Sequence, residues 1–183
     1  MNKAAFLDRD GVINVKAPEG QYVTRWEEVR FLPGVAAAIS RLNESGFRVI
    51  VISNQRCVAK GLVTSAEVEA LHRRISKELA DLGAIIDAVY FCPHDTEPAC
   101  SCRKPAPGML LQAAKDHQID LGISWMIGDS DADVAAGKNA GCKTALIARR
   151  TNFSASVPDL HAESLLQATE RIFESEGLSQ ATG

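Results

Sequence analysis

The sequence predicts an α/β fold in which a mostly parallel β-sheet carries helices on both faces. Short apolar runs rich in β-branched residues alternate with segments of helical periodicity, as in consecutive βα units. Polar or acidic motifs directly follow three of these runs, and a parallel sheet binds its ligands at such strand ends. The 183 residues, 46% of them hydrophobic, can bury the core of one domain. We expect this domain to span residues 1–174, with a frayed polar tail at 175–183.

The predicted elements follow one another without internal repeats. The apolar runs predict strands at 4–7, 47–52, 85–91, 125–127 and 144–148. Helical patterns predict helices at 34–44, from Thr64 onward, at 107–116 and at 131–140. Thr64 and Glu67 have the spacing of a capping box. Gly46 and Gly141 are expected to end the helices before them. The helix from Thr64 has an apolar stripe at Val68, Leu71, Ile75, Leu79 and Leu82.

Composition and charge exclude several classes of partner. A net charge of −3 and a pI near 5.8 argue against binding to nucleic acid or to an anionic membrane. We find no apolar run of membrane-spanning length, and the N-terminus lacks the pattern of a signal peptide. Five cysteines, an odd number, fit a reduced compartment better than a disulfide framework. We expect a monomeric cytoplasmic protein whose partner is a small molecule.

The pair Asp8 and Asp10 directly follows the first apolar run. Side chains two residues apart in an extended chain point to the same side, so one carboxylate can attack an electrophile while the other moves a proton. Gly11 lets the backbone bend there and approach a ligand closely. Turns and calcium loops also use Asp-x-Asp-Gly, but a calcium loop needs further oxygen ligands that positions 12, 13 and 15 do not supply. The segment therefore favours phosphoryl chemistry.

Two further strand ends carry polar groups. Ser53, Asn54 and Gln55 follow the second run, and a hydroxyl and an amide can bind phosphate oxygens without adding negative charge. Asp129 follows the fourth run and could complete an oxygen-lined magnesium site with Asp8. An ordinary turn after the second run, and helix N-capping by the acidic residues after the fourth, remain open as alternatives. Together these strand ends predict one shared site.

A basic pair, Arg103 and Lys104, precedes the helix predicted at 107–116. Lysine is a compact cation suited to a phosphoryl group, and arginine can bind a second anion with two parallel hydrogen bonds. A solvated pair of surface cations is the alternative. The pair gains a function only if the fold brings it beside the acidic strand ends.

Four possible metal ligands, Cys92, His94, Cys100 and Cys102, lie within eleven residues. Three thiols and an imidazole form a closed tetrahedral set, which is typical of structural zinc rather than catalytic zinc. The set lies directly before Arg103, so zinc would anchor the segment that presents the basic pair. Free cysteines with a chance histidine are the alternative, and the other cysteines and histidines show no ligand spacing.

Taken in this order, the motifs resemble the haloacid dehalogenase (HAD) superfamily of aspartate-nucleophile phosphatases over about residues 4–148. They resemble one branch in particular, the D-glycero-D-manno-heptose 1,7-bisphosphate 7-phosphatases and the related histidinol-phosphatases. The residues that carry this resemblance are Leu7-Asp-Arg-Asp-Gly11, Ile13-Asn14-Val15, Tyr22-Val23, Cys92-Pro-His94 and Cys100-x-Cys102-Arg-Lys-Pro-x-Pro-Gly-Met109. The resemblance implies a Rossmann-like HAD core.

The resemblance also implies roles for residues. Asp8 would be the nucleophile that forms an aspartyl-phosphate, Asp10 the general acid and base, and Ser53 and Lys104 the groups that hold the phosphoryl group. Mg²⁺ would be held by the Asp8 carboxylate, the Asp10 main-chain carbonyl and Asp129, while Zn²⁺ would be structural. The substrate-binding residues would be Arg9, Tyr22, Ser53, Asn54, Gln55, Arg56, Arg103, Lys104 and Ser130. The substrate would be heptose 1,7-bisphosphate, a precursor of the lipopolysaccharide core, or alternatively histidinol phosphate.

The chain departs from that branch at two places. Arg56-Cys57 stands where the heptose bisphosphatases typically have Ser-Gly, so an added cation could contact a second phosphate. Residues 16–21 form a slightly longer flap than usual, and the whole stretch 12–31 is too short for a cap domain. The site should be fairly open, with selectivity set by the loops around it.

Two other classes of function remain open. A phospho-acceptor signalling module would keep its phosphate, but Asp10 would speed the loss of an acyl phosphate. A zinc-organised nucleic-acid binder is disfavoured by the net acidity and by the lack of a basic-aromatic stretch.

Overall fold

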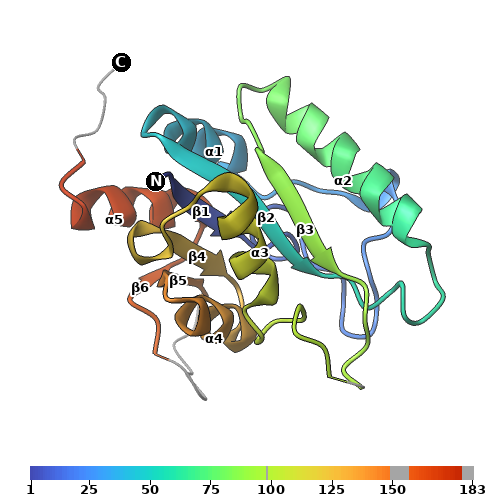
Figure 1. The fold of residues 1–183 in the computed structure, drawn as a ribbon. Coiled ribbons are helices and arrows are strands. Elements are labelled where there is room, and N and C mark those ends of the chain that lie inside the picture. Colours follow the sequence, from blue (N-terminus) through green and yellow to red (C-terminus); the bar gives the residue numbers. More distant parts are fainter. Residues whose placement is uncertain (98, 149–156, 179–183) are drawn as a thin grey trace.

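The computed structural model describes residues 1–97, 99–148 and 157–178, which form a six-stranded sheet between two layers of helices (Figure 1). All strand pairs are parallel, and the order is β3-β2-β1-β4-β5-β6. The strands are β1 (Lys3–Leu7), β2 (Phe47–Asn54), β3 (Ala88–Cys92), β4 (Trp125–Gly128), β5 (Lys143–Ile147) and β6 (Leu160–Ala162). The helices are α1 (Val35–Glu44), α2 (Ser65–Ala80), α3 (Gly108–His117), α4 (Asp131–Ala140) and α5 (Leu165–Ser175).

Side-chain alternation in the central strand divides the core into two layers. In β1, Ala5 and Leu7 face the core formed with α1, α2 and α5, whereas Ala4 and Phe6 face the core formed with α3 and α4. Because helices cover both faces, every one of these side chains is buried. This explains why the predicted strands read as continuous apolar runs.

The sheet places its functional edge beside β1. Leu7 pairs with Val51 of β2 on one side and with Ile127 of β4 on the other, so the residues after these strands emerge together. The chain connections also change direction between β1 and β4, and ligands of open parallel sheets bind at such a switch point.

A loop rather than a domain separates β1 from α1. Asn14 forms a bridge with Phe31, and the Val15 amide donates to the Arg30 carbonyl at 2.8 Å, so the loop is closed at its base. Between these points the chain contains one 3₁₀ turn, η1 (Trp26–Glu28); a second, η2 (Leu121–Ile123), precedes β4. We call residues 15–30 the flap. The prediction of a flap in place of a cap domain is confirmed for this fully described segment.

Most predicted elements are confirmed, including the Thr64 capping box and the positive φ angles of Gly46 and Gly141. Residues 85–87 are not strand as predicted, because the Asp87 carboxylate instead accepts the Val49 amide at 2.8 Å beside the start of β3. Leu82 is not in the α2 stripe, since the helix ends at Ala80 and leaves Leu82 exposed.

The C-terminal elements β6 and α5 were not predicted. The α5 helix continues to Ser175, and the Glu176 carboxylate accepts the Trp125 indole N–H at 2.7 Å. The expected tail therefore does not begin at residue 175, and residues 179–183 lie outside the described chain. No described helix has the length and apolar character needed to cross a membrane.

Candidate active site

A cavity of about 350 Å³ opens where the carboxyl ends of β1, β2 and β4 meet. Asp8 and Asp10 enter it after β1, Asn54 from the end of β2, and Asp129 after β4. The flap forms another part of its wall. The sheet therefore brings the predicted strand-end motifs into one site.

Lys104 lies at the floor of the cavity between two carboxylates. Its Nζ is 2.9 Å from Asp8 Oδ1 and 2.6 Å from Asp133 Oδ1, and it donates to the Ile52 carbonyl at 2.7 Å. The side chain is 2% exposed, so the three contacts use the three N–H groups of a buried ammonium. Burial alone would lower the pKa of Lys104, but the charges of Asp8 and Asp133 raise it above its ordinary value. Lys104 is thus a fixed positive charge beside Asp8.

The carboxyl group of Asp8 is enclosed by protein. Burial raises its pKa to about 7, the nearby acidic groups Asp133 and Asp129 act in the same direction, and Lys104 opposes them. Cationic charge in the cavity, such as that of Lys104, therefore favours the ionised form of Asp8 at neutral pH.

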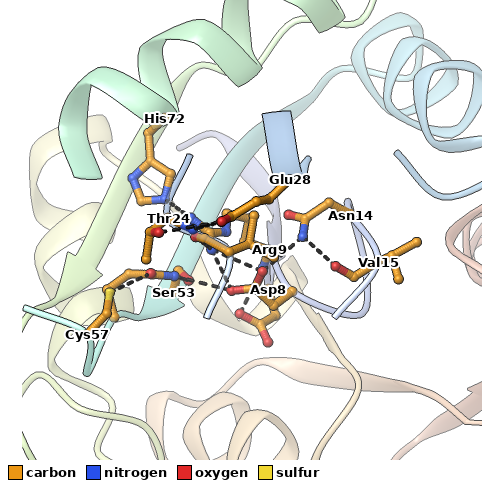
Figure 2. Close-up of polar contacts among 12 residues, drawn as sticks. Asp8, Arg9, Asn14, Val15, Thr24, Glu28, Ser53, Cys57 and His72 are labelled. Carbon is orange, nitrogen blue, oxygen red and sulfur yellow. Dashed lines mark hydrogen bonds and ion pairs between the residues drawn. The ribbon is translucent and has the colours of Figure 1, made fainter. Parts of the chain in front are cut away.

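Arg9 holds the carboxylate of Asp10 in place. Arg9 Nη2 donates to the two Asp10 carboxylate oxygens at 3.0 and 2.8 Å and also to the Val23 carbonyl at 3.0 Å. Its Nη1 lies 3.2 Å from Nε2 of His72 on α2 (Figure 2). Arg9 is 1% exposed and does not line the cavity. Its guanidinium points into the protein and orients Asp10, and contact of Arg9 with the substrate stays a prediction.

Two amide side chains complete the support of Asp10. Asn14 Nδ2 donates to Oδ1 at 2.9 Å, and Gln55 Nε2 approaches Oδ2 at 3.3 Å while donating to Ser53 Oγ at 2.8 Å. Ser53 and Gln55 are each 1% exposed and do not line the cavity. Contact of Ser53 with a phosphoryl group stays a prediction. The structure places Gln55 against the Asp10 carboxylate and Ser53 against Gln55.

The carboxylates of Asp8 and Asp129 fit a hard divalent cation. Ligand oxygens of Asp8, Asp129 and Asp133 all lie within 4.8 Å of one another. Asp129 Oδ1 is buried without a hydrogen-bond partner, and a Cβ at Gly11 would lie 2.3 Å from Asp129 Oδ2. Glycine at position 11, with φ +92°, therefore keeps this close approach possible. The Asp10 main-chain carbonyl as a third ligand stays a prediction.

Asp133 stabilises the start of α4. One oxygen contacts Lys104, and the other accepts the Ser130 hydroxyl at 2.5 Å and the Ser130 amide at 3.1 Å in a capping box. A Cβ at Gly128 would lie 2.1 Å from the Asp133 Cβ, so this packing needs glycine. With both oxygens used, Asp133 orients Lys104 and the start of α4.

The remaining predicted substrate residues divide into two groups. Those that line the cavity are Tyr22, Asn54, Arg103, Lys104 and Ser130. Arg56 does not line it, because its Nε pairs with Asp95 at 2.5 Å. The residue ties the loop after β2 to the cysteine-containing loop, and its contact with a second phosphate stays a prediction.

Asn54 connects the end of β2 to the basic pair. Its Nδ2 donates to the Lys104 carbonyl, and its Oδ1 accepts the Lys104 amide, each at 3.1 Å. Lys16 is a further residue at the cavity, which sequence analysis had placed only within a long flap. Its Nζ lies 2.8 Å from Asp129 Oδ2. The sequence signal that could have identified Lys16 was a positive charge in a loop predicted to lie at the edge of the site.

Cys92, His94, Cys100 and Cys102 converge as predicted, with ligand atoms within 4.8 Å of one another. The three sulfurs are 3.2 to 3.6 Å apart, close to the edge of about 3.8 Å expected for a tetrahedron with zinc–sulfur bonds of about 2.3 Å. All five cysteines are free thiols. The Arg103 amide donates to Cys100 Sγ at 3.3 Å, and Arg103 Nη1 donates to the His94 carbonyl at 3.2 Å. This set of donor atoms suits zinc. The same loop holds Arg103, whose positive charge lines the cavity.

Known proteins share both the sequence and the fold of this chain. A family model described as HAD-hydrolase-like matches residues 101–168. The D-glycero-beta-D-manno-heptose-1,7-bisphosphate 7-phosphatase of Rhodopseudomonas palustris is 49% identical over 145 residues, which cover 75% of this chain and 79% of that protein. The D-glycero-D-manno-heptose-1,7-bisphosphate 7-phosphatase of Thermosynechococcus vestitus is 40% identical over 190 residues, covering 92% and 94%. A crystal structure of D,D-heptose 1,7-bisphosphate phosphatase from B. bronchiseptica, complexed with magnesium and phosphate, superposes with a TM-score of 0.86 at 34% identity, covering 94% and 99%.

Proposed function

The chain belongs to the D-glycero-D-manno-heptose-1,7-bisphosphate 7-phosphatase family of HAD-like hydrolases, and we propose that it removes the 7-phosphate of heptose 1,7-bisphosphate. The product keeps its anomeric phosphate. The observation that carries this proposal is the contact of Lys104 Nζ with Asp8 Oδ1 in a buried pair at the end of β1, with Asp10 oriented beside it.

Asp8 is the nucleophile of this reaction. Its oxygen attacks the phosphorus in line with the sugar oxygen, so that an aspartyl-phosphate forms as the bond to the sugar breaks. Lys104, fixed by Asp133, stabilises the negative charge that gathers between the nucleophile and the phosphoryl group. Mg²⁺ held by Asp8 and Asp129 would add positive charge at the same place.

Asp10 is the general acid and base. It must first carry a proton to neutralise the departing sugar oxygen, and it then takes a proton from the water that hydrolyses the aspartyl-phosphate. Arg9, Asn14 and Gln55 hold its carboxyl group in one orientation. This support argues for an enzyme that turns over rather than a phospho-acceptor that keeps its phosphate.

The other proposed features follow from the same site. Arg103 and Tyr22 contact the sugar or its second phosphate from the cavity wall. Structural Zn²⁺ bound by Cys92, His94, Cys100 and Cys102 fixes the segment that presents Arg103 and Lys104. A cytoplasmic monomer that binds neither membrane nor nucleic acid completes the proposal.

A comparison of substrates tests the function. We expect kcat/KM to be higher for a heptose 1,7-bisphosphate anomer than for histidinol phosphate, whose cationic amine would approach Arg103, or for an aryl phosphate. Phosphorus NMR should show that the 1-phosphate remains on the product. A faster reaction with histidinol phosphate would reject the substrate while leaving the phosphatase chemistry intact.

Two substitutions test the chemistry. Asp8→Asn should remove measurable turnover, because an amide is not a phosphoryl acceptor.

Asp10→Asn should lower kcat by about 10²- to 10⁴-fold for the sugar phosphate and less for an activated aryl phosphate, whose leaving group needs no proton. Asp116→Asn, on the exposed side of α3, is the matched control. An equal loss on both substrates would contradict the role of Asp10.

A further inference from the structure

Lys16 is a positively charged residue of the flap, and the proposed reaction steps assign it no role. Its Nζ lies 2.8 Å from Asp129 Oδ2, and its side chain is 57% exposed where that of Asp129 is 16% exposed. It lines the same cavity as Tyr22 and Arg103. Lys16 thus joins the flap to Asp129, the carboxylate that follows β4, at the wall of the cavity.

The two lysines of the cavity differ in what they have left to donate. Lys104 spends its three N–H groups on Asp8, Asp133 and the Ile52 carbonyl. In the described part of the chain, the Lys16 ammonium donates a single hydrogen bond, to Asp129. Two N–H groups of an exposed ammonium therefore remain for an anion in the cavity.

The ion pair between Lys16 and Asp129 can break so that each residue takes another partner. Asp129 is also a ligand in the proposed magnesium site, and its other oxygen is buried without a partner. An ammonium and a divalent cation compete for the same carboxylate charge, so Lys16 is held less strongly once Asp129 binds a metal ion. Lys16 is then available to a different anion.

The side chain of Lys16 can move while the main chain of the flap stays in place. The neighbouring Val15 amide is anchored to the Arg30 carbonyl at 2.8 Å, so the main chain is fixed one residue away. The flexible four-carbon stem of lysine can carry its ammonium from one partner to another. Arg56 pairs with Asp95 and does not line the cavity, whereas Lys16 does.

We propose that Lys16 recognises the phosphate group that the enzyme does not cleave, by exchanging its contact with Asp129 for a contact with that phosphate. This inference rests on the proposed function, since it needs a substrate with two phosphates. Lys16 is then a specificity-determining residue: it adds binding energy for a bisphosphate and none for a monophosphate.

The test compares Lys16→Gln and Lys16→Arg on heptose 1,7-bisphosphate and on heptose 7-phosphate. A lost charge-assisted hydrogen bond should raise KM for the bisphosphate by about 10- to 100-fold in Lys16→Gln, with KM for the monophosphate unchanged. Lys16→Arg should recover most of the loss. Lys115→Gln, an exposed lysine on α3, is the control and should match the wild type.

A second measurement does not depend on turnover. Calorimetric titration of Mg²⁺ in the absence of substrate should show tighter binding to Lys16→Gln than to the wild type, because the competing ammonium is gone. Unchanged Mg²⁺ affinity would contradict the exchange.

The outcomes separate this inference from the proposed function. A wild-type enzyme that does not prefer the bisphosphate over the monophosphate would overturn the proposed function and the role of Lys16 with it. A wild-type preference that Lys16→Gln retains in full, or an equal rise of KM on both substrates, would overturn the role of Lys16 alone.

Discussion

The carboxylate cluster and the cysteine cluster lie at the same end of the sheet but balance their charges differently. Asp8 and Asp133 share the buried ammonium of Lys104, and Asp10 has the buried guanidinium of Arg9. The thiols of Cys92 and Cys102 contact each other and His94. The first cluster therefore carries its own counter-charges, while three of the four residues in the second, His94, Cys100 and Cys102, lie in the loop between β3 and α3.

This difference separates two uses of a metal ion. A carboxylate cluster that is already balanced can keep its shape while a catalytic cation exchanges. Ligands that lie mostly on a loop need a permanent ion to stay together, which is the behaviour of a structural site. The comparison leads to three predictions about stability.

The largest effect is expected when the counter-charge of the carboxylate cluster is removed. Lys104→Met keeps an unbranched side chain as far as Cε but leaves Asp8 and Asp133 buried without their cation. Breaking a buried pair in this way typically costs about 3–5 kcal/mol. Urea unfolding of zinc-loaded protein should show this loss in the free energy of unfolding, and added Mg²⁺ should restore more stability to the variant than to the wild type.

The control for that experiment is Lys115→Met on the surface of α3, which should unfold like the wild type. A Lys104→Met protein of unchanged stability would show that the carboxylates are not balanced by Lys104, and the contrast between the two clusters would fail.

A smaller loss is expected at the cysteine cluster. Cys102→Ser removes one thiolate, and if zinc binding weakens about 100-fold, stability at the same free zinc falls by about 2.7 kcal/mol. Zinc content, urea unfolding and hydrogen exchange of residues 92–104 measure the result. Because Arg103 follows directly, kcat/KM for the bisphosphate should fall as well.

Cys142→Ala is the matched control, because Cys142 is buried beside α4 and is not part of the cluster. Wild-type protein that contains no zinc, or Cys102→Ser protein with full zinc content, would reject the structural metal site.

The sequence could predict features that are local. Asp8, Asp129 and the four residues of the cysteine cluster follow from motifs a few residues long on strand ends or in one loop, and the parallel sheet then brings the strand ends together. The direction of Arg9 could not be predicted, because it depends on His72 in a distant helix. The pairs Arg56–Asp95 and Lys16–Asp129 likewise join side chains far apart in the chain.

The missed C-terminal elements have different causes. The strand β6 has three residues, too few for a periodic pattern. In α5, the buried positions Leu165, Ala168 and Ile172 do follow helical spacing, so this signal was present in the sequence. Lys16 was missed as a site residue because a lysine in a loop is ordinarily solvated, and only the fold shows which carboxylate it faces.

The smallest predicted effect concerns His72. His94 is a proposed metal ligand, whereas His72 is buried and its Nε2 accepts a hydrogen bond from Arg9 Nη1. Burial, helped by the charge of Arg9, lowers the pKa of His72 from 6.5 to about 3. The folded protein therefore keeps His72 neutral, so its Nε2 can accept from Arg9 and hold it against Asp10.

The pH dependence of unfolding tests this state of His72. Below pH 6.5 the unfolded chain takes up a proton that the folded chain refuses until about pH 3, so the stability contributed by His72 is present above pH 6.5 and is lost as the pH falls. Between about pH 7.5 and about pH 5.5 the wild type should lose about 1.4 kcal/mol more than His72→Gln, whose amide oxygen can still accept from Arg9. Urea unfolding of both zinc-loaded proteins at the two pH values measures the difference. Parallel losses would mean that His72 takes up its proton in the folded state, and that Arg9 is not held by a neutral imidazole.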